Sequence, residues 1–150
     1  MKEYRLNIDP HPAPRMVGRY PTKRTERYKE FRKELLMRAR LADLRDLPPA
    51  IGFTFEIKMP KSWSQAKKNR MRGQIHQQKP DLDNLIKAVL DSFTYGRHLD
   101  DSYVGTFLFA QKIWADKGRI VIWEVDPEEK NPVEKLMETI KTVLRFFKRS

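Results

Sequence analysis

The chain has 150 residues, which is enough for one ordinary domain and a single hydrophobic core. It carries 31 lysines and arginines against 20 aspartates and glutamates, a net charge of +11, and 39% of its residues are hydrophobic. This composition excludes a disordered polycation, and the lack of cysteine excludes a disulfide scaffold, a cysteine-ligated zinc site and a cysteine nucleophile. Because we find neither an apolar run of about 18 residues nor a secretory signal, we expect a cytoplasmic protein without a membrane partner. Its main partner is expected to be a polyanion.

Apolar periodicity and turn residues predict the elements along the chain. The predicted elements are strands at 4–8, 51–59, 103–114 and 118–125, and helices at 25–44, 64–71, 82–93 and 132–148. Thr25 is the predicted N-cap of the first long helix, Ser62 or Ser64 that of the short one, and Gly96 the end of the third. This order predicts an α+β fold, in which one domain of residues 1–130 packs helices on a mixed sheet and residues 131–150 add an amphipathic helix.

The positive charge is unevenly distributed. Residues 1–80 hold 20 basic and 8 acidic side chains, residues 81–130 hold 6 and 10, and residues 131–150 hold 5 and 2. Carboxylates repel a phosphate ligand, so an acidic block inside a basic protein needs a reason. A bound metal ion would supply one. Chance combined with helix capping is the alternative.

The acidic block contains the segment with the clearest chemistry, KPDLDNLIKAVLD at residues 79–91, followed by Asp100 and Asp101. Because a proline precedes the helix, Asp81 is predicted to cap it and Asp83 to lie in its first turn. At 100° per residue, Lys87 lies about 40° and Asp91 about 80° around the helix from Asp83, so the three form one polar seam beside the apolar stripe.

Several carboxylates without histidine or cysteine form an oxygen-only site, which suits Mg²⁺ or Mn²⁺. Such an ion can polarise a phosphoryl oxygen and activate a water, and a nearby lysine can stabilise the charge that develops on the phosphate. Together they would suit the hydrolysis of a phosphodiester. The alternative is structural, because aspartates at helix starts and i, i+4 ion pairs are ordinary features of helices. Asp91 by itself is better explained as an ion-pair partner than as a metal ligand.

The same segment closely resembles the signature of RusA-type Holliday junction resolvases, and MPKSWS at residues 59–64 with Lys67 and Lys68 resembles the basic segment that precedes it. The similarity covers roughly residues 3–125. It implies a RusA-like homodimer, encoded by a bacterium or phage, that cuts four-way DNA junctions symmetrically with Mg²⁺, or with Mn²⁺ in its place, and no nucleotide cofactor. It also implies that Asp81, Asp83 and Asp101 are catalytic carboxylates that bind the metal, with Asp100 as the alternative to Asp101, and that Lys87 is the catalytic lysine.

Basic side chains in two segments are candidate contacts to DNA phosphates. They are Arg15, Arg19, Lys61, Lys67, Lys68, Arg70 and Lys79. For any one of them a solvated surface role is the alternative. Trp63 either stacks on an opened base or is a core or dimer anchor, and the second interpretation is favoured.

The remaining apolar and aromatic residues are assigned structural roles. Phe53, Phe55, Phe107 and Phe109 alternate along strands and are predicted to be core, whereas the histidines, including His76, are predicted to be on the surface. The terminal helix is predicted to pack on its own domain or on a dimer partner.

Three functions follow from the sequence. The first is a Mg²⁺-dependent endodeoxyribonuclease that resolves Holliday junctions in recombination and repair. The second is a basic DNA-binding protein without catalysis, and the third is a metal nuclease that acts on flaps or forks.

Overall fold

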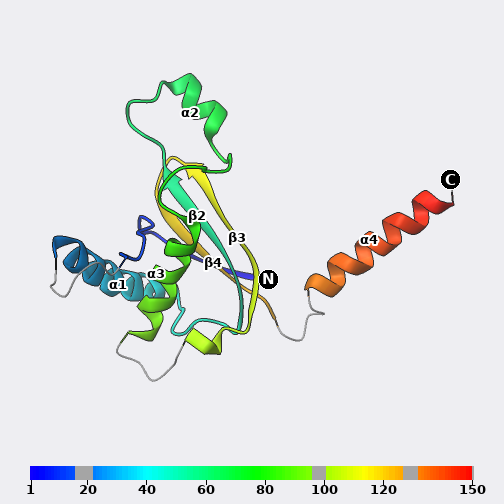
Figure 1. Cartoon of the computed structure of the whole chain (residues 1–150), viewed down its shortest axis with the longest axis horizontal. Helices are drawn as coiled ribbons and strands as arrows, with labels where there is room; N and C mark the ends of the chain where they lie inside the picture. Colours follow the sequence, from blue (N-terminus) through cyan, green and yellow to red (C-terminus); the bar gives the residue numbers. More distant parts are fainter. Residues whose placement is uncertain (16–21, 96–100, 127–131, 150) are drawn as a thin grey trace.

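The computed structural model describes residues 1–15, 22–95, 101–126 and 132–149, without the side chains of Asp101, Pro132 and Val133. The predicted order of elements is confirmed within these ranges (Figure 1). In chain order they are β1 (Lys2–Leu6), α1 (Lys23–Leu41), β2 (Ala50–Lys58), α2 (Gln65–Met71), α3 (Leu82–Thr94), the 3₁₀ turn η1 (Asp101–Tyr103), β3 (Thr106–Ala115), β4 (Arg119–Glu124) and α4 (Pro132–Lys148).

The sheet is mixed, as predicted. In the described part of the chain its four strands lie in the order β1-β4-β2-β3, with β2 and β3 parallel and the other two pairs antiparallel. The turn at residues 116–118 joins β3 to β4, yet β4 pairs with β2 rather than with β3. The parallel pair requires a crossover connection, and the segment that contains α2 and α3 supplies it.

Helices α1 and α3 cover one face of the sheet (Figure 1). Phe53 and Phe55 of β2 are fully buried between the sheet and these helices, as predicted. The apolar stripes of both helices also enter this core, through Tyr28, Phe31, Leu35, Ala39, Leu85, Ala88, Val89 and Phe93.

The start of α1 differs from the prediction. Its N-cap is Thr22, and the Thr25 hydroxyl accepts a hydrogen bond from the Thr22 backbone N–H at 2.8 Å, as the third helical residue of a capping box does. The sequence placed the start three residues late because the first apolar position of the stripe is Tyr28, and apolar periodicity does not mark a polar first turn. Ser64 is confirmed as the cap of α2, and Gly96 lies outside the described residues.

Two aromatic predictions are wrong. Phe107 and Phe109 of β3 are 48% and 36% exposed, because β3 is an edge strand. Phe107 packs on Phe53 with ring centroids 5.8 Å apart, whereas Phe109 lies over Gly52. Alternation along a strand predicts which side a residue faces, but not whether another element covers that side.

Helix α4 extends away from the sheet and from the other helices (Figure 1). All its described side chains, from Glu134 onward, are exposed. The predicted packing of this helix on its own domain is therefore not observed. Across the described ranges, no helix combines the length and the apolar character needed to cross a membrane.

Candidate active site at the N-terminal end of α3

The acidic motif begins α3 as predicted. Asp81 occupies the N-cap position, with extended backbone angles, but its side chain accepts no capping hydrogen bond, and Asp83 lies in the first turn. Pro80 precedes the cap. Leu85 is the first buried residue of α3 and is 1% exposed. Burial of the apolar stripe thus fixes the rotation of α3 about its axis and leaves the polar seam at the surface.

Asp81 lies among positive charges. The Lys79 ammonium donates to both of its carboxylate oxygens, at 2.7 and 2.8 Å, and Arg15 Nη2 lies 3.5 Å from one of them. The hydrogen bonds from Lys79 are the main reason that the pKa of Asp81 is lowered, and the charges of Arg15 and Lys112 lower it further. Asp81 is therefore a carboxylate at neutral pH, as a metal ligand must be.

The polar seam is confirmed, and its three members differ in their surroundings. Asp83 and Lys87 are exposed, and the Asp83 carboxylate accepts only the neighbouring Asn84 N–H among the contacts described, at 2.9 Å. Asp91 instead accepts a hydrogen bond from the Tyr28 hydroxyl of α1 at 2.8 Å. The partner of Asp91 among the described contacts is thus a tyrosine hydroxyl rather than the predicted ion-pair partner, whereas Asp83 and Lys87 face solvent.

Lys112 is a contributor that the sequence analysis missed. It comes from β3, and its ammonium donates to the backbone carbonyls of Gln78 and Pro80, at 2.5 and 2.7 Å. It therefore connects the sheet to the segment that leads directly into Asp81. Burial lowers the pKa of Lys112, while the negative charge of Asp81 raises it. Ala110 and Trp114 lie on the same face of β3 as Lys112. A lysine among apolar residues that alternate toward the core is the feature of the sequence that could have identified it.

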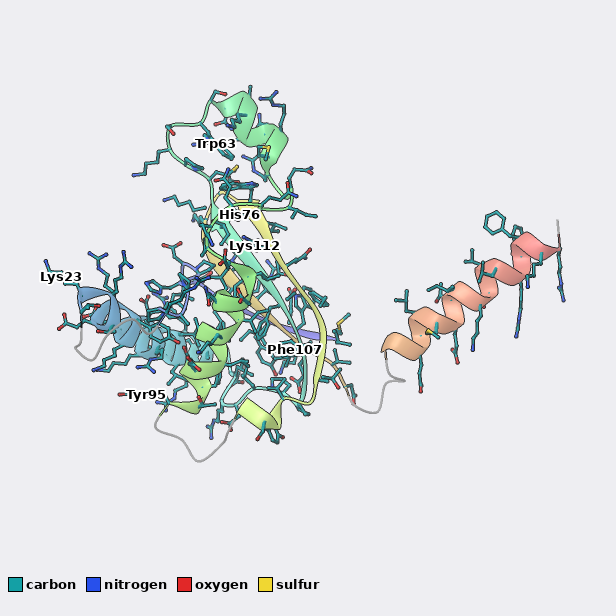
Figure 2. All side chains as sticks on the ribbon, in the orientation of Figure 1. Lys23, Trp63, His76, Tyr95, Phe107 and Lys112 are labelled. Atoms are coloured by element: carbon teal, nitrogen blue, oxygen red, sulfur yellow. The ribbon has the colours of Figure 1, made fainter. Side chains whose placement is uncertain are left out.

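His76 and Trp63 belong to the segment between β2 and α3, and both lie close to Lys112 (Figure 2). His76 is only 3% exposed, so its predicted surface position is wrong. Its ring lies 4.3 Å from that of Trp114, which in turn lies 4.6 Å from Trp63. Burial and the charge of Lys112 lower the pKa of His76, so its imidazole is neutral at pH 7. Trp63 is partly buried and packs against Trp114 of the sheet, which is in part the predicted core role.

The structure does not bring Asp101 to the two aspartates of α3. Its backbone begins η1, beside the end of α3 from which the chain leaves the helix (Figure 1). Asp81 and Asp83 lie at the other end of this 13-residue helix, about 20 Å away along its axis. The side chain of Asp101 and all of Asp100 lie outside the described residues. Among the described side chains, no group of three His, Cys, Asp or Glu is placed to hold a metal ion.

The predicted DNA contacts fall into two groups. Arg15 and Lys79 lie against Asp81, and Arg19 is outside the described residues. The second group lies on the α2 segment, a helix without buried residues that extends from the end of the sheet (Figure 1). Its members are Lys61, Lys67, Lys68 and Arg70. Lys67 covers the Trp63 ring at 4.3 Å, which leaves Lys61 and Arg70 as its fully exposed cations.

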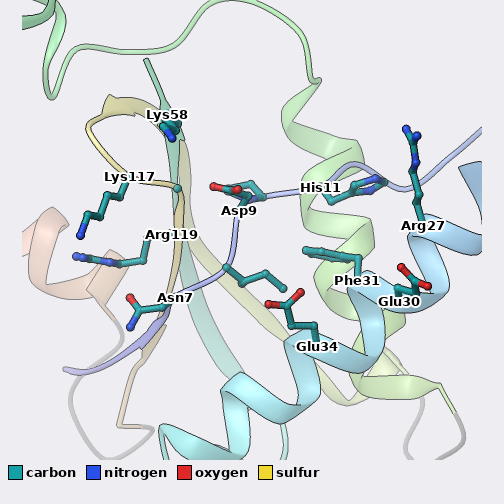
Figure 3. A pocket seen from close by; sticks show the side chains of 13 residues that line it. Asn7, Asp9, His11, Arg27, Glu30, Phe31, Glu34, Lys58, Lys117 and Arg119 are labelled. Carbon is teal, nitrogen blue, oxygen red and sulfur yellow. The ribbon is translucent and has the colours of Figure 1, made fainter. Parts of the chain in front are cut away.

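A cleft of about 900 Å³ lies elsewhere, between α1, the segment after β1 and the turn before β4 (Figure 3). Its lining mixes carboxylates with cations, including Asp9, Glu30, Lys58, Arg27 and Arg119. It shares no residue with the acidic motif. The cleft is therefore separate from the motif, whose Asp83 and Lys87 are exposed to solvent.

Comparison with protein families gives one match, to the model described as "Endodeoxyribonuclease RusA", over residues 8–123. The matched range contains β2 to α3, with the acidic motif, and excludes α4. A comparison with individually curated proteins found no match.

Proposed function

The chain belongs to the RusA endodeoxyribonuclease family, a family of phosphodiester hydrolases, and from this membership we propose that it is a Mg²⁺-dependent nuclease that resolves four-way DNA junctions. The observation that carries the proposal is the pair of solvent-accessible carboxylates within one turn at the start of α3, of which Asp81 is half-buried among cations and Asp83 is exposed. Capping alone does not require this surrounding charge. A phosphate-binding site that also holds a metal requires both signs of charge.

The residues present fit a magnesium ion. Mg²⁺ is commonly held by one or two carboxylates, with waters and substrate phosphate oxygens completing its shell, and Asp81 and Asp83 are carboxylates of this kind. When bound, the ion would polarise the scissile phosphate and lower the pKa of an attacking water. An ion on Asp81 would compete with the Lys79 ammonium for the same two oxygens. We propose Asp101, or Asp100, as a further ligand, which within one chain requires residues 96–101 to approach the start of α3.

The cations then act on the DNA. We propose that Lys87 stabilises negative charge on the phosphate at this site, which is supported by its position one turn beyond Asp83 on the same seam. Arg15 and Lys79 flank the carboxylates, and the cations of the α2 segment extend the positive surface along the backbone of the substrate. We also propose a homodimer, because two equivalent strands of a junction need two equivalent sites.

The test compares cleavage of a four-way junction, a flap and a plain duplex, with Mg²⁺, with Mn²⁺ and with a chelator. We expect preferential cleavage of the junction, at least 100-fold slower in Asp81→Asn and Asp83→Asn, with binding to the junction retained. Glu26→Gln, which changes a carboxylate in the first turn of α1, is the matched control and should cut normally. Full activity of Asp83→Asn would show that the site is wrong. Faster cleavage of flaps would favour the third function, and binding without cleavage the second.

A further inference from the structure

Helix α4 presents an apolar face that is largely exposed in the described part of the chain. Six of its apolar side chains are between 46% and 70% exposed. They are Leu136, Met137, Ile140, Val143, Leu144 and Phe147. An isolated helix of 17 residues is only marginally stable in water, because most helical stability in proteins comes from packing an apolar face. Such a face is accordingly expected to have a partner.

The apolar pattern is symmetric about Ile140. Apolar residues stand three, four and seven positions before it and at the same three distances after it. Two copies of α4 that cross antiparallel at Ile140 therefore match each of these apolar residues with another, whereas Phe146 lies outside the pattern. The matched pairs are Val133 with Phe147, Leu136 with Leu144, Met137 with Val143, and Ile140 with itself.

The charges of α4 agree with this direction. Glu134 and Glu138 precede Ile140, whereas Lys141, Arg145 and Lys148 follow it, and all five lie on one flank, about 80° to 160° around the helix from Ile140. The opposite flank carries Pro132, Lys135, Thr139, Thr142 and Phe146, of which only Lys135 is charged. In an antiparallel pair the charged flanks face each other, so that the acidic half of one helix lies against the basic half of the other. A parallel pair would instead place the charged flank of each helix beside the opposite flank of the other, and the acidic half of one helix would not meet the basic half of its partner.

We propose that α4 pairs antiparallel with α4 of a second copy of this chain, about a two-fold axis at Ile140. Side chains of this size offer roughly 60 to 120 Å² each, so twelve of them offer on the order of 1,000 Å² in total, near the lower end of specific interfaces. The pairing is thus expected to be reversible. Because α4 lies outside the matched residues 8–123, this contact is separate from any that the family fold supplies.

Cross-linking tests the direction of the pair, because the chain has no cysteine of its own. In the full-length protein under mild oxidation, Ile140→Cys should form disulfide-linked dimers at least 10-fold faster than Leu136→Cys, since only position 140 meets itself. A mixture of Leu136→Cys and Leu144→Cys chains should cross-link as fast as Ile140→Cys. Thr142→Cys, on the other face of α4, is the control. Equal rates at positions 140 and 136 would refute the antiparallel direction, and equal rates at 140 and 142 would refute the pairing.

Sedimentation equilibrium of the full-length chain, without DNA or metal, gives the second readout. Ile140→Glu places two carboxylates on the axis and should halve the number of chains in the assembly, while Thr142→Glu should leave it unchanged. An assembly unaffected by Ile140→Glu would refute the proposal. If that variant instead lost only its binding to vesicles of anionic phospholipid, the face would serve a membrane surface. None of these outcomes depends on nuclease activity.

Discussion

Lys112 offers a direct test of how the sheet positions the acidic motif. Its ammonium connects β3 to the backbone just before Asp81, through hydrogen bonds to the carbonyls of Gln78 and Pro80. Replacing it with methionine keeps most of the apolar stem and removes the ammonium. The segment that leads into Asp81 then loses both hydrogen bonds, while α3 itself keeps its packing.

The magnitude follows from these two bonds. A hydrogen bond to a charged group contributes about 1.5–3 kcal/mol when it is well shielded from water. Lys112 is only partly buried, and water can replace it at both carbonyls, so we expect Lys112→Met to lower the free energy of unfolding by about 2 kcal/mol. If this free energy is expressed wholly in the position of Asp81, it sets an upper limit of roughly 30-fold on the loss of kcat.

The assay is single-turnover cleavage of a four-way junction, measured with urea unfolding of the same proteins. Lys117→Met, at an exposed lysine of the turn before β4, is the matched control, and Lys112→Arg should recover part of the loss. The acid limb of the pH–rate profile should also move to higher pH, because the charge of Lys112 contributes to the lowered pKa of Asp81. Lys79→Met should move it further, since Lys79 is the main cause. A kcat within twofold of the parent and an unmoved acid limb would refute the positioning role.

Three further predictions concern stability and binding. Burial lowers the pKa of His76 below its unfolded value of about 6.5, so the unfolded state takes up the proton first as the pH falls. The free energy of unfolding should therefore be constant above that pH and decrease below it. His76→Gln should flatten this dependence in denaturant melts between pH 5 and 8. Gly118→Ala should cost about 1–3 kcal/mol by thermal unfolding, because the new methyl would overlap the Asp9 carboxylate and lie 3.0 Å from the Asp9 Cα. Gly52→Ala should cost less, since it meets the ring of Phe109, a half-exposed side chain that can turn away, and equal costs would contradict this explanation. Junction binding should weaken steeply with salt, and Lys61→Ala with Arg70→Ala should lower the slope of log K against log salt by about 2; an unchanged slope would remove the α2 segment from the DNA surface.

Local rules were sufficient for the start of α3. A proline, a capping aspartate and an apolar stripe act within a few residues of one another, so the sequence by itself placed Asp81 at the cap and Asp83, Lys87 and Asp91 on one seam. The same reasoning predicted the buried pair Phe53 and Phe55, because a central strand buries its alternating side under whatever helices follow. The sign change of charge along the chain was also readable without coordinates.

What only the tertiary structure decided depends on which elements become neighbours. Lys112 is thirty-one residues from Asp81 in the sequence, and it meets the motif because β3 pairs with β2 in parallel and therefore passes beneath the start of α3. The burial of His76 follows from its packing on Trp114 of the same strand. The exposure of Phe107 and of α4 could not be predicted from the sequence. An apolar pattern shows that a face can be buried, but the packing of other elements decides whether it is covered.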